Sequence, residues 1–181
     1  MDLFDIQHQS GQDNTAGLMT EFYFAKLDDI DTFPKPADNP STPSEKMTIS
    51  SDFTMKSGKG FHKGYMTWGR GGVSWSLQGP MDGKSFTHNF EFYKPGADKE
   101  SLAFLSLAKN ENLVFIVKDK DGNFRVVGSE GIPAKMDSVD GGTGQSGEDD
   151  KGDTITFVSE GANPPYFYEG SVPVAAASGS A

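Results

Sequence analysis

Two neighbouring runs of strict alternation constrain the fold of this chain most. Residues 73–78 (VSWSLQ) and 85–92 (SFTHNFEF) place an apolar or aromatic side chain at every second position, with polar side chains between them. A period of two is typical of β-strands that have one buried face and one wet face. Because the turn-forming residues 80–83 (PMDG) lie between the runs, we expect the two strands to pair as an antiparallel hairpin.

The polar positions of the two runs share one face of this hairpin. They are Ser74, Ser76, Gln78, Ser85, Thr87, Asn89 and Glu91. His88 falls on the apolar face, where a packed and hydrogen-bonded core histidine is a simpler interpretation than a catalytic base. The polar face is the part of the hairpin that meets solvent, a ligand or another subunit.

The rest of the chain predicts more strands and a single helix. Residues 18–27 and 154–161 have the pattern of strands, and the continuous apolar run 113–117 predicts a strand that is buried on both faces. Residues 98–109 predict a short helix that Asp98 caps. Leu102 and Leu105 fall at helical spacing, and Phe104 and Leu107 widen this apolar stripe, which we expect to pack on a sheet face. The expected fold class is therefore mainly β: an antiparallel β-sandwich or partial barrel with one flanking short helix, an extended N-terminal arm and long loops.

We expect one domain over residues 1–181. Residues 1–50 hold the N-terminal strand and a proline-rich arm, residues 51–172 form the β core with the helix, and residues 173–181 are a mobile tail. Four prolines within ten residues exclude regular structure from the arm, which we interpret as a candidate contact between subunits. Its candidate residues are Phe33, Pro34, Pro36, Pro40 and Pro43. Residues 132–153 predict a long acidic, glycine-rich loop.

Composition narrows the range of functions. The net charge of −10 disfavours binding to nucleic acid or to anionic membranes. The chain has no cysteine, which excludes disulfides, thiolate metal sites and cysteine nucleophiles. Residues 1–14 lack the basic and apolar regions of a secretory signal, and no apolar run is long enough to span a membrane.

Two stretches resemble ligand-binding motifs, but neither has the residue spacing that its motif requires. Residues 79–85 (GPMDGKS) fall one residue short of a phosphate loop and precede a strand. Residues 119–123 (DKDGN) lack the later ligands of a calcium loop. The acidic residues of 137–153 leave open a cation site, although such loops are usually solvated. His88 and Glu91 lie on opposite faces of one strand, so we predict no enzyme, no metal and no cofactor.

Three segments, 17–36, 83–136 and 142–170, together resemble the major tail tube proteins of bacteriophages, in particular those of the Bacteroidetes type. The hairpin VFIVKDKDGNFRVVGSE at 114–130 carries the resemblance best. It implies a β-sandwich or partial barrel flanked by one helix. Six copies would form a ring whose strands join in an inner β-barrel, and stacked rings would form a tube for DNA.

The resemblance also implies partners and a location. The partners are further copies of the chain, the tail terminator, the baseplate or tip, the tape measure, possible sheath subunits, and DNA that passes without tight binding; no membrane is involved. The location is the tail of the virion, assembled in the cytoplasm of the host bacterium. The polar strand residues would face the channel or the solvent leading to it, and the proline-rich arm would contact neighbouring subunits. Contractile and non-contractile tails both remain open.

Two other classes of function remain open. A capsid decoration protein or head–tail connector would also be small, β-rich and without catalytic residues. A carbohydrate- or ligand-binding β-sandwich would use an aromatic platform, although such aromatics more often pack in cores or line interfaces. The platform candidates are Tyr65, Trp68, Trp75, Tyr166 and Tyr168.

Overall fold

The computed structural model describes residues 3–8, 10–12 and 14–176. Strands account for 42% of the chain and helices for 10%, which confirms the mainly β fold class. The elements are β1 (Leu18–Lys26), η1 (Leu27–Asp29), β2 (Ile30–Thr32), α1 (Pro43–Lys46), β3 (Thr48–Ile49), β4 (Thr54–Met55), β5 (His62–Tyr65), β6 (Gly71–Gln78), β7 (Ser85–Pro95), α2 (Lys99–Ala108), β8 (Leu113–Asp119), β9 (Phe124–Val127), β10 (Lys135–Gly142), β11 (Gly152–Gly161) and β12 (Phe167–Tyr168).

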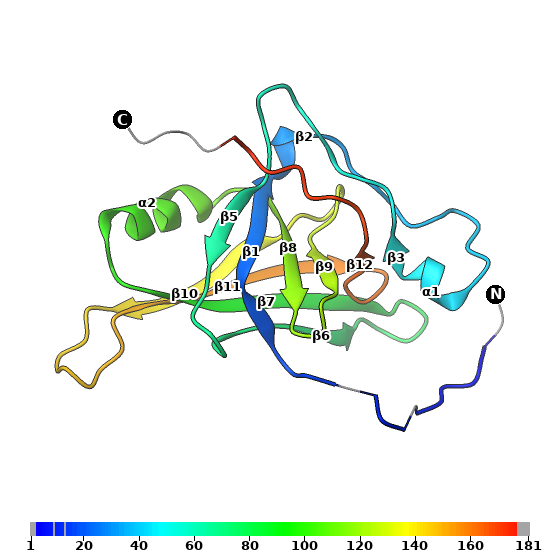
Figure 1. The fold of residues 1–181 in the computed structure, drawn as a ribbon, viewed down its shortest axis with the longest axis horizontal. Coiled ribbons are helices and arrows are strands. Elements are labelled where there is room, and N and C mark those ends of the chain that lie inside the picture. The colour runs from blue at the N-terminus through cyan, green and yellow to red at the C-terminus, as the bar shows by residue number, and fades with distance from the viewer. Residues whose placement is uncertain (1–2, 9, 13, 177–181) are drawn as a thin grey trace.

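Two sheets form the body of the molecule. One has six strands in the order β3-β12-β9-β8-β1-β5, and the other has four in the order β10-β11-β7-β6. In Figure 1 the strands of the four-stranded sheet run across the direction of β1 and β8, and α2 lies at one end of the pair. A further pair, β2 and β4, is short. This arrangement is the expected sandwich with one flanking helix.

Phenylalanine rings fill the space between the two sheets. Phe22 of β1 and Phe115 of β8 meet Phe92 and Phe157 of the four-stranded sheet, with ring centroids 4.6 Å apart in both the Phe22–Phe92 and Phe115–Phe157 pairs. All four side chains are buried. Aromatic pairs at this distance contribute about 0.5–1.5 kcal/mol each beyond the area they bury. The aromatic core therefore fixes how the two sheets face each other.

A second core covers the other face of the six-stranded sheet. Val114 and Ile116 of β8 point into it, together with Ile49 of β3 and with Phe53 and Phe61 from segments that lie against this face. The residues of β8 from Leu113 to Val117 are all buried, which confirms the prediction of a strand covered on both sides. Because the short β2–β4 pair and the segments beside it provide this cover, the residues from 30 to 61 belong to the fold itself.

Four expectations from the sequence need correction. Much of the predicted acidic loop is strand β10, which pairs with β11. Pro43 begins the one-turn helix α1, because proline suits the first position of a helix. Pro173 and Ala175 exchange backbone hydrogen bonds with Phe61, so the tail does not begin at residue 173; residues 177–181 lie outside the described residues. Of the predicted apolar stripe of the helix, Leu102 and Leu107 are exposed.

Helix α2 is otherwise as predicted. The Asp98 side chain accepts a hydrogen bond of 2.7 Å from the Ser101 N–H and so caps the helix. The helix rests on the sandwich through Phe104, whose ring meets Phe24 at 5.4 Å. Leu102 and Leu107 point away from this contact and are exposed, because the helix touches the end of the sheets and not the middle of a face.

Candidate functional site

The outer face of the four-stranded sheet is polar. Ser74 lies opposite Asn89, Ser76 opposite Thr87, and Gln78 opposite Ser85 in the register of β6 with β7. Directly opposed residues point to the same side of a sheet, so the structure brings the predicted polar residues, Glu91 included, onto one surface. Their apolar neighbours Phe90 and Phe92 are buried on the other side.

Strands β11 and β10 extend this polar surface. Thr156 lies opposite Glu91 in β7 and opposite Ser138 in β10. The same parity adds Thr154, Glu160 and Asp140, while Lys135 stands at the rim. Reasoning from sequence missed these residues because they come from strands more than 40 positions further along the chain. We call the whole surface the polar sheet face. Its charged strand residues are Glu91, Asp140, Glu160 and Lys135, and the Arg70 guanidinium lies on the Tyr93 ring, 3.7 Å from its centroid, at one end of the face.

The two outer strands of this sheet, β6 and β10, have no strand partner on their outer side within the described residues. Tyr93 donates a backbone hydrogen bond of 2.8 Å to Arg70, and this pair directly precedes the pair Gly71–Phe92. Hydrogen-bonded and non-hydrogen-bonded pairs alternate in antiparallel sheets. Ser74 and Ser76 therefore bond to β7, and the backbone N–H and C=O groups of Val73, Trp75 and Leu77 point to the free edge.

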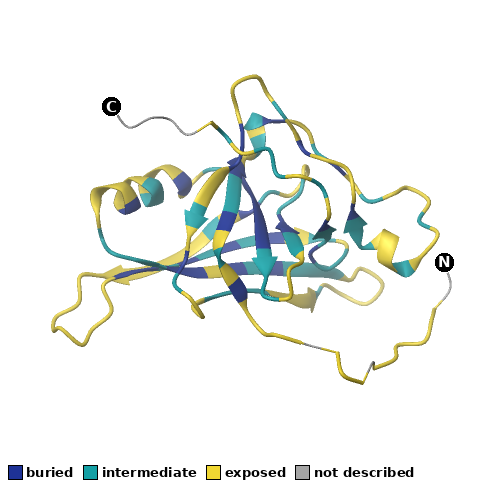
Figure 2. Cartoon of the chain, viewed as in Figure 1, coloured by how far each residue is buried: buried dark blue, intermediate teal, exposed yellow. Residues whose placement is uncertain are grey.

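The free edges are also partly apolar. Trp75 is 44% exposed and Leu77 is 59% exposed, although both belong to the face that was expected to be buried. The six-stranded sheet covers β7 and β11 more fully than the outer end of β6, which explains the difference. Val139 on β10 is exposed as well, and Figure 2 shows β10 and the loop beyond it largely in the colour of exposed residues.

The predicted arm lies against its own subunit. The Phe33 ring packs edge-on against Phe53 at 4.9 Å, and Pro34 is buried. Pro36, Pro40 and Pro43 are half-buried. The segment around these three prolines is the part of the arm that remains accessible to a neighbour.

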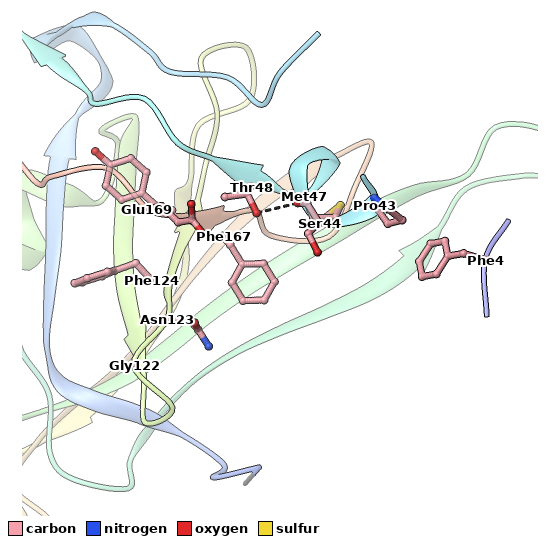
Figure 3. A pocket seen from close by; sticks show the side chains of 11 residues that line it. Phe4, Pro43, Ser44, Met47, Thr48, Gly122, Asn123, Phe124, Phe167 and Glu169 are labelled. Atoms are coloured by element: carbon pink, nitrogen blue, oxygen red, sulfur yellow. Dashed lines mark hydrogen bonds between the residues drawn. The ribbon is translucent and has the colours of Figure 1, made fainter. Parts of the chain in front are cut away.

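A hollow of about 710 Å³ lies between the N-terminal segment and the α1 end of the six-stranded sheet. Figure 3 shows Phe4 on one side of it and Phe167 and Phe124 on the other, with Met47 and Pro43 between. The N-terminal segment is held where the Thr15 N–H donates to Asp121. Further toward its start, Leu3, Phe4 and Ile6 are exposed. This short segment therefore presents apolar side chains that the subunit itself does not cover.

His88 is a core residue, as predicted. It is buried, its Nε2 lies 2.8 Å from the Asn163 carbonyl oxygen, and its Nδ1 lies 3.5 Å from Ser159 Oγ. Burial lowers the pKa of His88 below its usual value. Sequence reasoning missed the Ser159 contact because the two residues are 71 positions apart. Ser159 is itself buried, so this serine–histidine pair offers no exposed nucleophile.

The five candidate platform aromatics do not share one exposed surface. Tyr168 is buried and its hydroxyl donates to the Ser171 carbonyl at 2.6 Å. Trp68 lies beneath Lys120 Nζ at 4.4 Å, and the Arg125 guanidinium lies 5.4 Å from the Trp75 ring. The Tyr168 ring is therefore not available to a ligand, whereas Tyr65, Trp68 and Trp75 remain exposed.

The acidic loop is ordered by its own hydrogen bonds. Asp149 accepts from the backbone N–H groups of Gln145 and Ser146, both at 2.8 Å, and these bonds lower the pKa of Asp149. Asp150 pairs with Arg70 at 2.7 Å. Within the part of the chain that the structure describes, no three histidine, aspartate or glutamate side chains gather as a metal site would require.

Comparisons of this chain with protein-family models, with curated proteins and with solved structures found no match. Among the described residues, no helix has the length and apolar character needed to cross a membrane. The polar sheet face, its two free edges and the exposed N-terminal apolar residues are therefore the features from which a function must be inferred.

Proposed function

We propose that this chain is a structural subunit that polymerises into hexameric rings and then into a hollow tube, as the major tail tube proteins of bacteriophages do. The observation that carries the proposal is the four-stranded sheet. It combines a polar face with two edge strands, β6 and β10, that lack an outer partner among the residues described. Exposed sheet edges are usually blocked or paired, and closure into a barrel pairs them fully.

The directions of the strands suit ring closure. All three pairings of the sheet are antiparallel, so β6 and β10 run in opposite directions. A rotation about the ring axis keeps the direction of each strand along that axis. Strand β6 of one copy would therefore meet β10 of the next as an antiparallel pair, through the free N–H and C=O groups of Val73, Trp75 and Leu77.

The polar sheet face would line the channel, because the second sheet of the sandwich occupies the other side. Six copies give a barrel of roughly two dozen strands, whose backbone circle is about 37 Å across at ~4.8 Å per strand before strand tilt widens it. Serine and threonine side chains leave such a bore open. Glu91, Asp140 and Glu160 would repel phosphates, so that DNA passes without tight binding.

The exposed N-terminal residues would join one ring to the next. Leu3, Phe4 and Ile6 have little apolar cover in the subunit, and the hollow beside Phe124 and Phe167 offers an apolar surface of suitable size. The accessible prolines of the arm would add contacts between subunits. In this proposal the protein is a non-enzymatic part of the virion tail, assembled in the host cytoplasm with the other tail proteins as neighbours.

The absence of cysteine permits a direct test of the channel face. Ser76→Cys places a single thiol on the polar sheet face, and Ser50→Cys places one at an exposed position away from it. In monomers both thiols should react with a maleimide attached to a polyethylene glycol chain. In sedimented polymers the thiol at position 76 should be protected from this bulky reagent, while the thiol at position 50 reacts. Equal reactivity at position 76 in monomer and polymer would count against a luminal polar face.

A further inference from the structure

A separate pocket of about 360 Å³ lies where the start of α2 meets strands β1, β5, β7 and β11. Phe24, Phe92 and Phe104 form an aromatic wall, with the Phe24 and Phe104 rings edge-on at 5.4 Å. The volume is within the range of small-molecule sites. The pocket is distinct from the polar sheet face, because Phe92 and its neighbours on β11 point to the opposite side of that sheet.

Two buried polar groups in this pocket lack partners. Asp153 is 5% exposed and Ser101 is 7% exposed, and both line the pocket. Asp153 Oδ2 and Ser101 Oγ are the two buried side-chain atoms without a hydrogen-bond partner in the described residues. A buried carboxylate oxygen without a partner is strongly unfavourable, so its presence beside an open pocket points to a cationic or hydrogen-donating ligand.

The nearby lysines are occupied elsewhere. Lys94 lies opposite Asp153 in the register of β7 with β11, but its Nζ donates to the Pro95 carbonyl at 2.8 Å and lies 3.8 Å from Asp98. Lys63 pairs with Glu21 at 3.1 Å.

Gly141 stands across from Asp153, and a Cβ there would overlap the carboxylate. The glycine therefore lets Asp153 sit in this position.

We propose that this pocket binds a primary ammonium group carried on an apolar stem. An ammonium group has three hydrogen-bond donors and no acceptor, which matches the carboxylate of Asp153 and the hydroxyl of Ser101. The rings of Phe24, Phe92 and Phe104 would surround the stem and attract the charge through their faces. Such a group belongs to a free alkylamine or to a lysine side chain of another protein.

The test is a titration of the purified monomer with two probes, hexylammonium chloride and N-acetyl-lysine amide, followed by NMR shifts of backbone amides. We expect a dissociation constant on the order of 1 mM for at least one probe, with shifts at Ser101 and Asp153. If only hexylammonium binds, the site is assigned to free amines. If N-acetyl-lysine amide binds more tightly than hexylammonium, the site is assigned to lysine side chains. Neutral hexanol should bind more weakly than hexylammonium.

Variants decide whether the pocket is responsible. Asp153→Asn should weaken binding about tenfold or more, because it removes the charge and keeps the shape. Ser101→Ala should weaken it less, and Asp140→Asn, on the exposed β10 strand, should leave it unchanged. Circular dichroism checks that each variant is folded; Ser101→Ala still tests the site if Asp153→Asn does not fold.

Failure of both probes to bind the wild-type protein, or binding that Asp153→Asn leaves unchanged, would overturn the proposal. The proposal would also be overturned if the probes bound the Lys94→Met variant and not the wild-type protein. In that case the Lys94 ammonium group would already pair with the Asp153 carboxylate in solution. These measurements use the monomer, so their outcome does not depend on whether the protein forms tubes.

Discussion

The backbone N–H of Trp75 is the sharpest point at which to break the proposed contact between neighbouring subunits of one ring. Trp75→Pro removes this N–H, which points to the free edge of β6, and leaves the hydrogen bonds between β6 and β7 in place. Proline is tolerated in edge strands at positions of this kind. Trp75→Ala is the matched control, because it removes the same side chain and keeps the N–H.

The expected effect can be worked out for one contact. A lost hydrogen bond costs about 0.5–1.5 kcal/mol, and a carbonyl of the facing β10 strand left without a donor costs about 1–3 kcal/mol. A total of about 2 kcal/mol weakens each contact roughly 30-fold, since every 1.4 kcal/mol is a factor of ten. The loss recurs at every contact of a ring, so Trp75→Pro should not form rings at concentrations where Trp75→Ala does.

Sedimentation velocity and negative-stain microscopy measure the assembly, and urea denaturation measures the fold. Trp75→Pro and Trp75→Ala should unfold at similar urea concentrations, whereas Ser76→Pro, which loses a bond to Thr87, should be less stable by about 1–3 kcal/mol. Rings of Trp75→Pro at the same protein concentration as Trp75→Ala would refute the assignment of β6 as the closing edge.

Three further predictions concern other parts of the molecule. Burial lowers the pKa of His88 below its usual 6.5, so the unfolded chain takes up this proton first. The contribution of His88 to the free energy of unfolding is full above pH 6.5 and falls as the pH drops toward the folded-state pKa. In urea denaturation at several pH values, His88→Gln should therefore lose this fall in the free energy of unfolding below pH 6.5. The control His62→Gln, at an exposed histidine, should keep it. Replacing Leu3, Phe4 and Ile6 with serine should leave rings but prevent stacked tubes in electron micrographs, and long tubes would contradict the stacking role. Exchanging residues 36–41 for a Gly/Ser segment of equal length should lower the free energy of unfolding by about 1–2 kcal/mol, because two prolines no longer restrict the unfolded chain, and should stop tube growth. Phe33→Ala, which loses the contact with Phe53, should cost about 2 kcal/mol and serves as a control of similar stability in which the accessible prolines are kept. Normal growth of the exchanged protein would remove the arm from the interface.

Much of the fold was predictable because its pattern is local. The alternation in β6 and β7, the apolar run of β8 and the cap of α2 each reflect a burial pattern within one element. Strand β10 was not predictable, because nearly all of its residues are exposed on an edge and its sequence carries no apolar period. The exposure of Trp75 and Leu77 depends on how far the second sheet reaches, which alternation within one strand does not reveal.

The candidate site divides in the same way. The polar residues of β6 and β7, which alternate from Ser74 to Gln78 and from Ser85 to Glu91, could be assigned to one face from the period of two alone. Thr154, Thr156 and Glu160 join that face only through the pairing of β11 with β7, which is a long-range contact. The lack of partners at Asp153 and Ser101 likewise follows from the packing of α2 against two sheets and leaves no mark in the sequence.

The central claim is that copies of this chain close into a ring through β6 and β10. Two-dimensional class averages of the concentrated, purified protein in electron microscopy test it most directly. We predict six-fold rings with an open bore, stacked into tubes, whose inner wall is the four-stranded sheet. Particles that remain single subunits at every concentration and salt condition, or that associate without a bore, would contradict it.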